Sequence, residues 1–304
     1  MKTPFSRICL LVLLSGTLLL AKNENEGKSG LAFLKIGVGA RAAGMGEAFV
    51  AVSNDAFSAF WNPAALTRSP SSNVVFAYNN WFQDVKARFG AVAFKKQRSA
   101  LAFHGYSVSV GDIQVRTTPT NDPLETTSAN YLALGISYSR TFSSQLKWGV
   151  TVKYLFEKIF VHSASGYAVD MGILYQGLLP NLTVGSTFQN LGTMNALQDQ
   201  KTQLPKIFRL GAAYSLPEIS QSVALLFSGD LVKPLEENLR FHLGSELLFQ
   251  GQLALRLGYV MGYESRHLSL GVGVLKTAIH VNYSFTPIEE NLGNSHRFDL
   301  YLSL

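Results

Sequence analysis

Hydrophobic and polar residues alternate with a period of two along most of this chain. At its end, Phe298, Leu300, Leu302 and Leu304 share one face, and polar residues such as Arg297 lie on the other. Segments 147–156, 253–261, 267–274 and 278–285 alternate in the same way. Because successive side chains of a β-strand point to opposite faces, the pattern predicts strands with one apolar face and one polar or glycine-rich face.

The composition of the two faces indicates what each contacts. The polar faces carry mostly Gly, Ser, Thr and Asn with scattered single charges, and the apolar faces carry Trp, Tyr and Phe toward the strand ends. Lipid outside and a packed or wet lumen inside account for both features. A closed barrel also satisfies every backbone amide within hydrocarbon. We therefore predict an all-β fold, a transmembrane antiparallel β-barrel, and keep a secreted β-sandwich as the alternative.

The number of strands and the lengths of their connections test this prediction. Connections near 97–98, 143–145, 178–180, 217–220, 251 and 276 are short, whereas the long ones, 110–128, 191–204 and 287–295, all fall at the opposite end. Bacterial barrels have an even strand number, short periplasmic turns and longer outer loops. If residues 111–117 formed a further strand, the strand number would be odd, so we place them in an outer loop. The fourteen predicted strands are 74–82, 86–96, 99–109, 129–142, 146–159, 163–177, 181–190, 205–217, 220–233, 238–249, 251–262, 266–275, 277–286 and 296–304.

The first residues predict export from the cytoplasm. Lys2 and Arg7 precede an apolar run from Ile8 to Leu20, and Ala21 offers a small residue for cleavage. This arrangement is typical of a secretory signal peptide. A membrane anchor is the alternative, but the run is shorter than the roughly 20 residues that a spanning helix needs. We expect residues 1–21 to be removed and the mature chain to lie in the outer membrane of a Gram-negative-type bacterium.

Composition narrows the function classes. The chain has 304 residues, of which 47% are hydrophobic and 15% are charged, with 26 glycines and a formal charge of +6. So low a charged fraction argues against a disordered protein and against a nucleic-acid partner. The single cysteine lies within the predicted signal peptide, and the six histidines show no metal-ligand spacing. We find no nucleophile, base and acid that would make the chain an enzyme, and we expect no cofactor or metal.

Residues 22–73 exceed what a barrel needs, since the predicted barrel occupies 74–304. An apolar segment at 31–36 and a glycine-rich stretch precede two short helical pieces. Asn54 or Asp55 caps the first piece, and Asn62 caps the second, with Pro63 at its first position. We expect these residues to form a periplasmic hatch or plug in the barrel mouth.

The same region carries a long motif. Residues 33–66 resemble the N-terminal signature of the PorV/PorQ family, which belongs among the FadL-like outer-membrane barrels. The Asn-Pro-Ala element is shared with FadL-type channels, where it belongs to the hatch. The resemblance assigns structural roles in the hatch to Gly39, Arg41, Gly44, Met45, Gly46, Asp55, Trp61, Asn62 and Pro63.

The resemblance implies a fourteen-stranded barrel and a place in type IX protein secretion, as a cargo-handling or scaffold component. The implied partners are outer-membrane lipid, the C-terminal domains of secreted cargo and other secretion components, with loops 110–128 and 191–204 as contact surfaces. The motif does not separate PorV-like from PorQ-like members. The alternative function is a FadL-like uptake channel for hydrophobic small molecules, which implies a bound hydrophobic ligand or lipid.

Charges on the inward faces predict how the plug is held. Positive and negative side chains are nearly balanced there, which favours a paired network over a substrate path. Inward glycines, among them Gly149, Gly172, Gly244, Gly258 and Gly271, remove side-chain volume and favour a plugged scaffold over an open pore. The predicted network comprises Lys153, Glu157, Asp170, Arg209, Asp230, Arg240, Glu246, Arg256 and Asp299.

Overall fold

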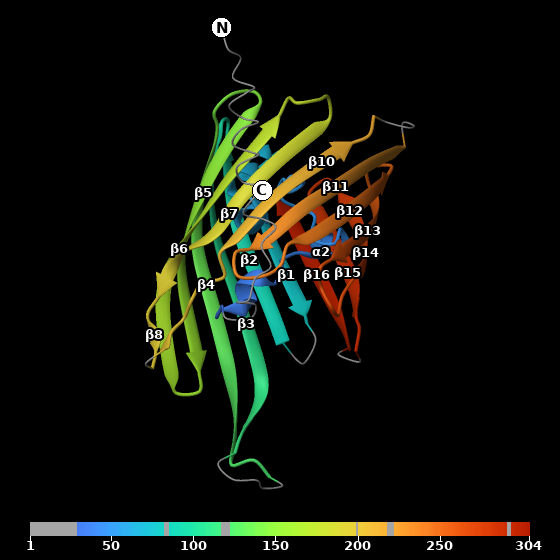
Figure 1. Cartoon of the computed structure of the whole chain (residues 1–304). Coiled ribbons are helices and arrows are strands. Elements are labelled where there is room, and N and C mark those ends of the chain that lie inside the picture. Colours follow the sequence, from blue (N-terminus) through green and yellow to red (C-terminus); the bar gives the residue numbers. More distant parts are fainter. Residues whose placement is uncertain (1–28, 82–84, 117–121, 199, 218–221, 291–292) are drawn as a thin grey trace.

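The computed structural model describes residues 29–81, 85–116, 122–198, 200–217, 222–290 and 293–304, and the predicted signal peptide lies outside them. Fourteen antiparallel strands form a closed barrel, as predicted (Figure 1). The barrel strands are β1 (Asn73–Asn80), β2 (Val85–Lys96), β3 (Ser99–Val115), β4 (Glu125–Thr141), β5 (Leu146–Ile159), β6 (His162–Gln176), β7 (Leu182–Met194), β10 (Ile207–Ser215), β11 (Val223–Pro234), β12 (Arg240–Phe249), β13 (Leu253–Met261), β14 (Leu268–Lys276), β15 (Ile279–Ile288) and β16 (Gly293–Ser303).

Closure joins the first strand to the last. β1 pairs with β16 from Asn73↔Ser303 to Asn80↔His296. The backbone N–H of Leu304 donates to the carbonyl of Ser72 at 2.8 Å. Both ends of the barrel sequence therefore lie at the end with the short turns, which is the periplasmic end of a bacterial barrel.

All three predicted outer loops contain regular structure, and in 287–295 the strands β15 and β16 stay paired as far as Ile288↔Gly293. Residues 111–115 continue β3 beyond a bulge between Val110 and Ile113, and they pair with the start of β4. The prediction that placed 111–117 in a loop was therefore wrong for 111–115: a bulge lets one strand continue without adding a strand to the count. The loop after β7 contains a small hairpin, β8 (Ala196–Leu197) with β9 (Gln200–Lys201).

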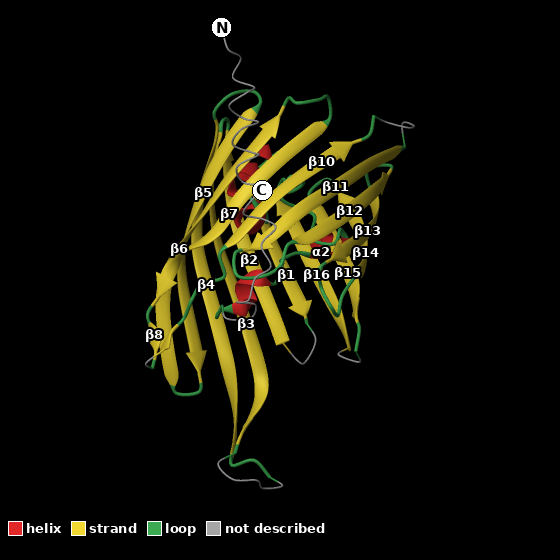
Figure 2. Cartoon of the chain, in the orientation of Figure 1, coloured by secondary structure: helices red, strands yellow, loops and turns green. Residues whose placement is uncertain are grey.

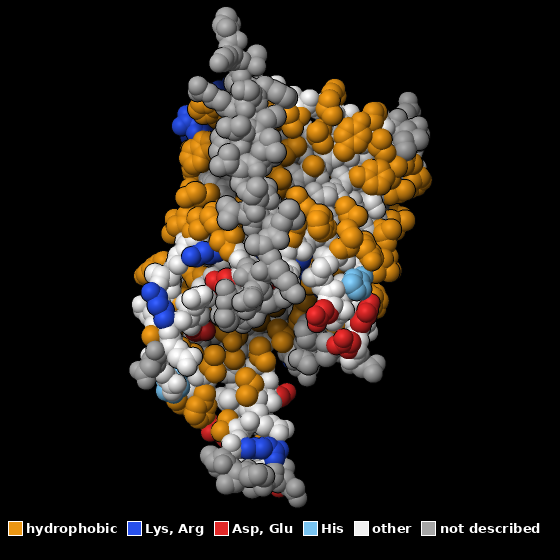
Figure 3. All heavy atoms as spheres, in the orientation of Figure 1, with side chains coloured by type: hydrophobic (Ala, Val, Ile, Leu, Met, Phe, Trp, Pro, Cys, Tyr) orange, Lys and Arg blue, Asp and Glu red, His pale blue; other side chains and the backbone are white. Residues whose placement is uncertain are grey.

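The outward face is apolar over most of its height. Outward-facing residues of β13, such as Leu253, Leu255 and Leu257, are 40–51% exposed, and inward Arg256 is 4% exposed. Figure 3 shows hydrophobic side chains over most of the visible wall, with the visible acidic groups toward the end that bears the long hairpins. Within the described residues, no helix has the length and apolarity to cross a bilayer.

The segment before β1 lies inside the barrel. It contains η2 (Ala32–Lys35), α2 (Ala40–Gly44), α3 (Ser58–Trp61) and η3 (Pro63–Arg68), and Figure 2 shows these helices enclosed by strands. α2 contacts β13 to β16, and η3 contacts β2 to β6. We call residues 29–72 the plug. It starts near the outer end, where the Gly30 N–H donates to the Gln203 carbonyl, and it ends at the periplasmic start of β1.

Candidate functional site between plug and barrel wall

Arg41 is the centre of the contact between the plug and β12 to β16. Its guanidinium donates to both carboxylate oxygens of Glu246 at 2.7 and 2.8 Å and to Asn54 Oδ1 at 2.9 Å. Arg256 donates to the same Glu246 at 2.6 Å and, through Nη1, to Asn282 at 2.8 Å. Burial alone lowers the pKa of Arg41, but Glu246 more than offsets burial and holds the pKa above its ordinary value. Both groups therefore stay charged as a buried pair.

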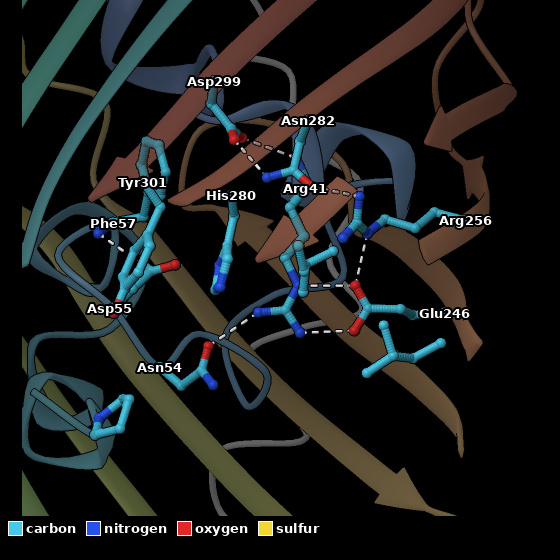
Figure 4. Close-up of a pocket in the computed structure, with 13 residues that line it drawn as sticks. Arg41, Asn54, Asp55, Phe57, Glu246, Arg256, His280, Asn282, Asp299 and Tyr301 are labelled. Atoms are coloured by element: carbon cyan, nitrogen blue, oxygen red, sulfur yellow. Dashed lines mark hydrogen bonds and ion pairs between the residues drawn. The ribbon is translucent and has the colours of Figure 1, made fainter. Parts of the chain in front are cut away.

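Asp299 ties the start of α2 to β16. Its Oδ2 accepts the backbone N–H groups of Ala40 and Arg41 at 2.6 and 3.1 Å, and its Oδ1 accepts from Asn282 at 2.6 Å. These two N–H groups have no partner within the helix because they lie in its first turn. Figure 4 shows Arg41, Glu246, Arg256, Asn282 and Asp299 pointing toward one another from the plug and the wall.

A cavity of about 200 Å³ lies beside this cluster, lined by Arg41, Asn54, Asp55, His280 and Tyr301 among others. A second cavity of about 240 Å³ shares Arg41, Asn54 and Glu246 with the first. Both lie toward the periplasmic end. Burial raises the pKa of Asp55 to about 6, with Arg41 opposing the shift. Both linings combine charged side chains with apolar groups, and five of the residues that line the first cavity are Arg, Asp or Glu.

Glycines in the wall allow the plug backbone to approach closely. A Cβ on Gly258 would lie 1.9 Å from the Gly46 nitrogen, and one on Gly244 would lie 2.5 Å from the Met45 carbonyl oxygen. On the opposite side, a Cβ on Gly149 would lie 2.4 Å from the Pro63 carbonyl carbon. The inward glycines therefore do make room for the plug. Gly273 differs from these, since its nearest atoms belong to Asn282 and Arg256 of the wall.

The Trp61-Asn62-Pro63 element turns the chain between α3 and η3. Asn62 Oδ1 caps η3 by accepting from Ala64 N at 3.1 Å, and its Nδ2 donates to the carbonyls of Val50 and Ile173 at 3.1 and 3.2 Å. Trp61 Nε1 donates to the Val38 carbonyl at 3.0 Å. One amide side chain thus joins two plug segments to β6.

The predicted charge network divides into separate groups. Asp230 accepts the Phe49 and Val50 N–H groups of the plug at 2.8 and 3.0 Å, and the Arg209 guanidinium lies 5.2 Å from the Trp61 ring centre. Lys153 pairs with Asp170 at 2.7 Å within the wall. The two outermost members bind other groups: Glu157 accepts from Thr202, and Arg240 pairs with Glu237.

A buried cluster that the sequence interpretation missed lies nearer the outer end. Glu47 of the plug pairs with Arg297 at 3.0 Å and with Arg266 at 3.2 Å. Although burial favours the neutral acid, the two guanidinium groups hold the pKa of Glu47 well below its usual range. Arg297 lies two residues before Asp299 on the same face, so the alternation could have identified it. Glu47 had no such signal, because it lies outside the strands. The predicted strand 266–275 placed Arg266 on the same face as Leu268 and Leu270, whereas in the structure Arg266 precedes β14 and points to Glu47.

Neither site has the geometry of a resident metal centre. Among the residues that the structure describes, no group of three or more His, Cys, Asp or Glu side chains is arranged to hold an ion. The carboxylates here are instead engaged by guanidinium and backbone N–H groups.

The fold and its plug define an outer-membrane β-barrel of FadL-like architecture. Two solved structures are similar over nearly their whole length: the CymD monoaromatic hydrocarbon channel (14% identity, TM-score 0.60, covering 91% of this chain and 99% of that one) and the Pseudomonas putida toluene transporter TodX (12% identity, TM-score 0.59, covering 86% and 95%). At such low identity these similarities establish the fold.

The family comes from the sequence match. A family model described as the type IX secretion system protein PorV matches residues 21–224, more than half of the chain. The chain therefore belongs to the PorV family of type IX secretion-associated outer-membrane barrels. No protein with a curated description matches it in sequence.

Proposed function

We propose that this barrel handles secreted cargo or acts as a scaffold in a type IX-like secretion system, with a plug that stays in place. The observation that carries the proposal is the PorV family match together with a lumen occupied by the chain's own plug. Residues of the plug are tied to the wall by Glu246, Asp230 and Asp299 through hydrogen bonds of 2.6–3.1 Å. The proposal assigns no reaction and no cofactor to the chain.

The contact surface for cargo in this proposal is the set of hairpin tips at the outer end. β3 and β4 remain paired as far as Val115↔Glu125, and Figure 1 shows this hairpin extending beyond the others at the outer end. Leu124 beside its tip and Val161 in the turn between β5 and β6 are each 67% exposed. Apolar side chains that no lipid covers are typical of sites that contact another protein.

Deletion of the gene tests the function. Proteins that carry a C-terminal secretion signal should then accumulate in the periplasm, and normal surface display would contradict the proposal. Complementation with Leu124→Asp combined with Val161→Asp should restore the barrel but not display. A matched control is Leu179→Asp, since Leu179 is 62% exposed in a periplasmic turn; this variant should restore display.

The second candidate function is a channel for hydrophobic small molecules, favoured by the shared fold with CymD and TodX. In this hypothesis a ligand enters beside residues 37–66. Liposomes containing the purified barrel should then take up toluene faster than empty liposomes. Equal uptake by the two kinds of liposome would contradict the channel hypothesis and leave the secretion role as the proposed function of this protein.

We also propose that the exported chain is cleaved near Ala21, leaving residues 22–73 as the hatch and 74–304 as the barrel. Mass spectrometry of the protein purified from outer membranes should give a mature N-terminus close to residue 22. An intact Met1 would contradict the cleavage and favour a retained anchor.

A further inference from the structure

The lipid-facing side of β1 to β3 departs from the apolar pattern. Outward positions of β2 alternate with buried ones, and they include Lys86 and Arg88, both exposed. These two side chains therefore face outward on the same strand. The Arg88 guanidinium lies 5.9 Å from the centre of the neighbouring Tyr78 ring, which is also exposed. Among the described residues of β1, β2 and β3 as far as Ser109, no carboxylate faces outward.

The height of these cations places them at the outer boundary of the bilayer. Lys96 lies at the periplasmic end of β2, eight residues from Arg88 and ten from Lys86. At about 3.3 Å per residue and a tilt of about 40°, these distances correspond to roughly 20–25 Å along the barrel axis. The apolar band of such barrels is about 25 Å tall. Counted from Lys96, Lys86 therefore lies at the outer edge of the apolar band and Arg88 about 5 Å inside it. Long cationic side chains at such heights extend to the interface, where the phosphate groups of outer-leaflet lipids are found.

Small polar residues border the two cations. Lys86 is directly opposite Ser109, and Arg88 is directly opposite Ser107. Ser109 in turn is opposite Asn130 of β4. These groups supply hydroxyl and amide donors beside the charges, and phosphate oxygens accept hydrogen bonds from such donors.

Two glycines interrupt the outward side chains directly below the cations, toward the middle of the membrane. Gly90 and Gly105 both face outward and are paired across β2 and β3. A Cβ on Gly90 would come no closer than 3.5 Å to Phe76, and one on Gly105 no closer than 3.5 Å to Leu134. Packing does not demand glycine at either position, in contrast to the wall glycines that touch the plug. The row Phe76–Gly90–Gly105–Leu134 therefore lacks a side chain at its two central positions, and we call this gap the notch.

We propose that this surface, Lys86, Arg88, Ser107 and Ser109 above the Gly90–Gly105 notch, binds a phosphorylated glycolipid of the outer leaflet. The phosphate binds the two cations and the serine hydroxyl groups, and an acyl chain lies in the notch. Charge complementarity identifies this occupant, since cations facing lipid are costly unless they lie at the interface beside anionic groups. A bound lipid would fix how the barrel is oriented and which neighbours it meets.

Native mass spectrometry of the full-length mature barrel in detergent tests the proposal by titration with diphosphoryl lipid A. Lys86→Gln combined with Arg88→Gln should weaken binding about 25-fold, because each cation at an anionic lipid surface contributes a factor of about five. Gly105→Leu should also weaken binding by filling the notch. The matched control combines Lys96→Gln with Arg140→Gln, two exposed cations near the periplasmic end, and should bind as the wild type does.

Three results would overturn the proposal: equal binding of dephosphorylated lipid A, wild-type affinity in the Lys86/Arg88 variant, or an equal loss in the control. Equal binding of phosphatidylglycerol would overturn the glycolipid as occupant. A heat-dependent shift on gels checks that each variant is a folded barrel, so that weaker binding is not confused with misfolding.

Discussion

The two sides of the lumen hold the plug by different interactions. Toward β12 to β16, the plug is held by buried ion pairs and by backbone contact with wall glycines. Toward β2 to β4, aromatic rings hold it: Phe57 stacks on Phe89 at 5.6 Å, and Phe33 stacks on Tyr131 at 5.4 Å. We call the contacts toward β12 to β16 the ionic side and those toward β2 to β4 the aromatic side. Removing one partner on the ionic side leaves an unpaired buried charge, which is costly. The stability of the aromatic side depends mainly on how well side chains fill the volume.

The largest effect is expected where the plug backbone touches the wall. Gly258→Ala places a Cβ 1.9 Å from the Gly46 nitrogen, so backbone on one side must move. For the barrel in detergent, we expect the free energy of unfolding to fall by more than about 3 kcal/mol. Alternatively, the variant gives no folded band on a gel run without heating. Gly111→Ala is the control, since nothing lies within 4 Å of its added Cβ. Equal stability of the two variants would show that the plug does not press on β13.

Breaking the ion cluster should have the next largest effect. Glu246→Gln leaves Arg41 and Arg256 buried without their shared carboxylate, and we expect a loss of about 3 kcal/mol. The matched control is Glu289→Gln, whose 59% exposed side chain lies 3.8 Å from His267 and should cost less than about 1 kcal/mol. Denaturant titration of both variants measures the difference, and similar losses would contradict the ionic account.

Asp55 should give the ionic side a pH dependence. Burial raises the pKa of Asp55 from its ordinary value of 3.8 to about 6, so the folded state binds the proton more tightly than the unfolded state. Its contribution to stability is present below pH 3.8 and is lost as pH rises to about 6, by on the order of 1 kcal/mol per pH unit. Asp55→Asn should flatten this slope, and the exposed Asp112→Asn should not. An unchanged slope in Asp55→Asn would assign the dependence to other groups.

The smallest effect is expected on the aromatic side. Phe89→Leu keeps most of the volume against Phe57 and should cost less than about 1.5 kcal/mol. Phe89→Ala leaves a cavity and should cost about 3 kcal/mol or more. Thermal unfolding of the two variants separates volume from ring stacking: if leucine were as harmful as alanine, stacking would dominate.

Much of the barrel could be predicted because its determinants are local. The alternation in 253–261 predicts β13 within one to two residues at each end, since the pleat repeats every two residues whatever the rest of the chain does. The inward placement of Gly258 and Arg256 follows from the same period. The bulge after Val110 could not be predicted this way, because it depends on how β4 pairs with β3.

The sequence by itself determined the strands, their inward and outward faces, and the supply of charges and glycines inside the barrel. The tertiary structure decided the partners: that Glu246 binds Arg41, that Asp230 binds the backbone at Phe49, and that Glu47 lies between Arg266 and Arg297. These pairs join residues 180 to 250 positions apart. Closure of the barrel around the plug sets their distances, and no repeat along the chain encodes that geometry.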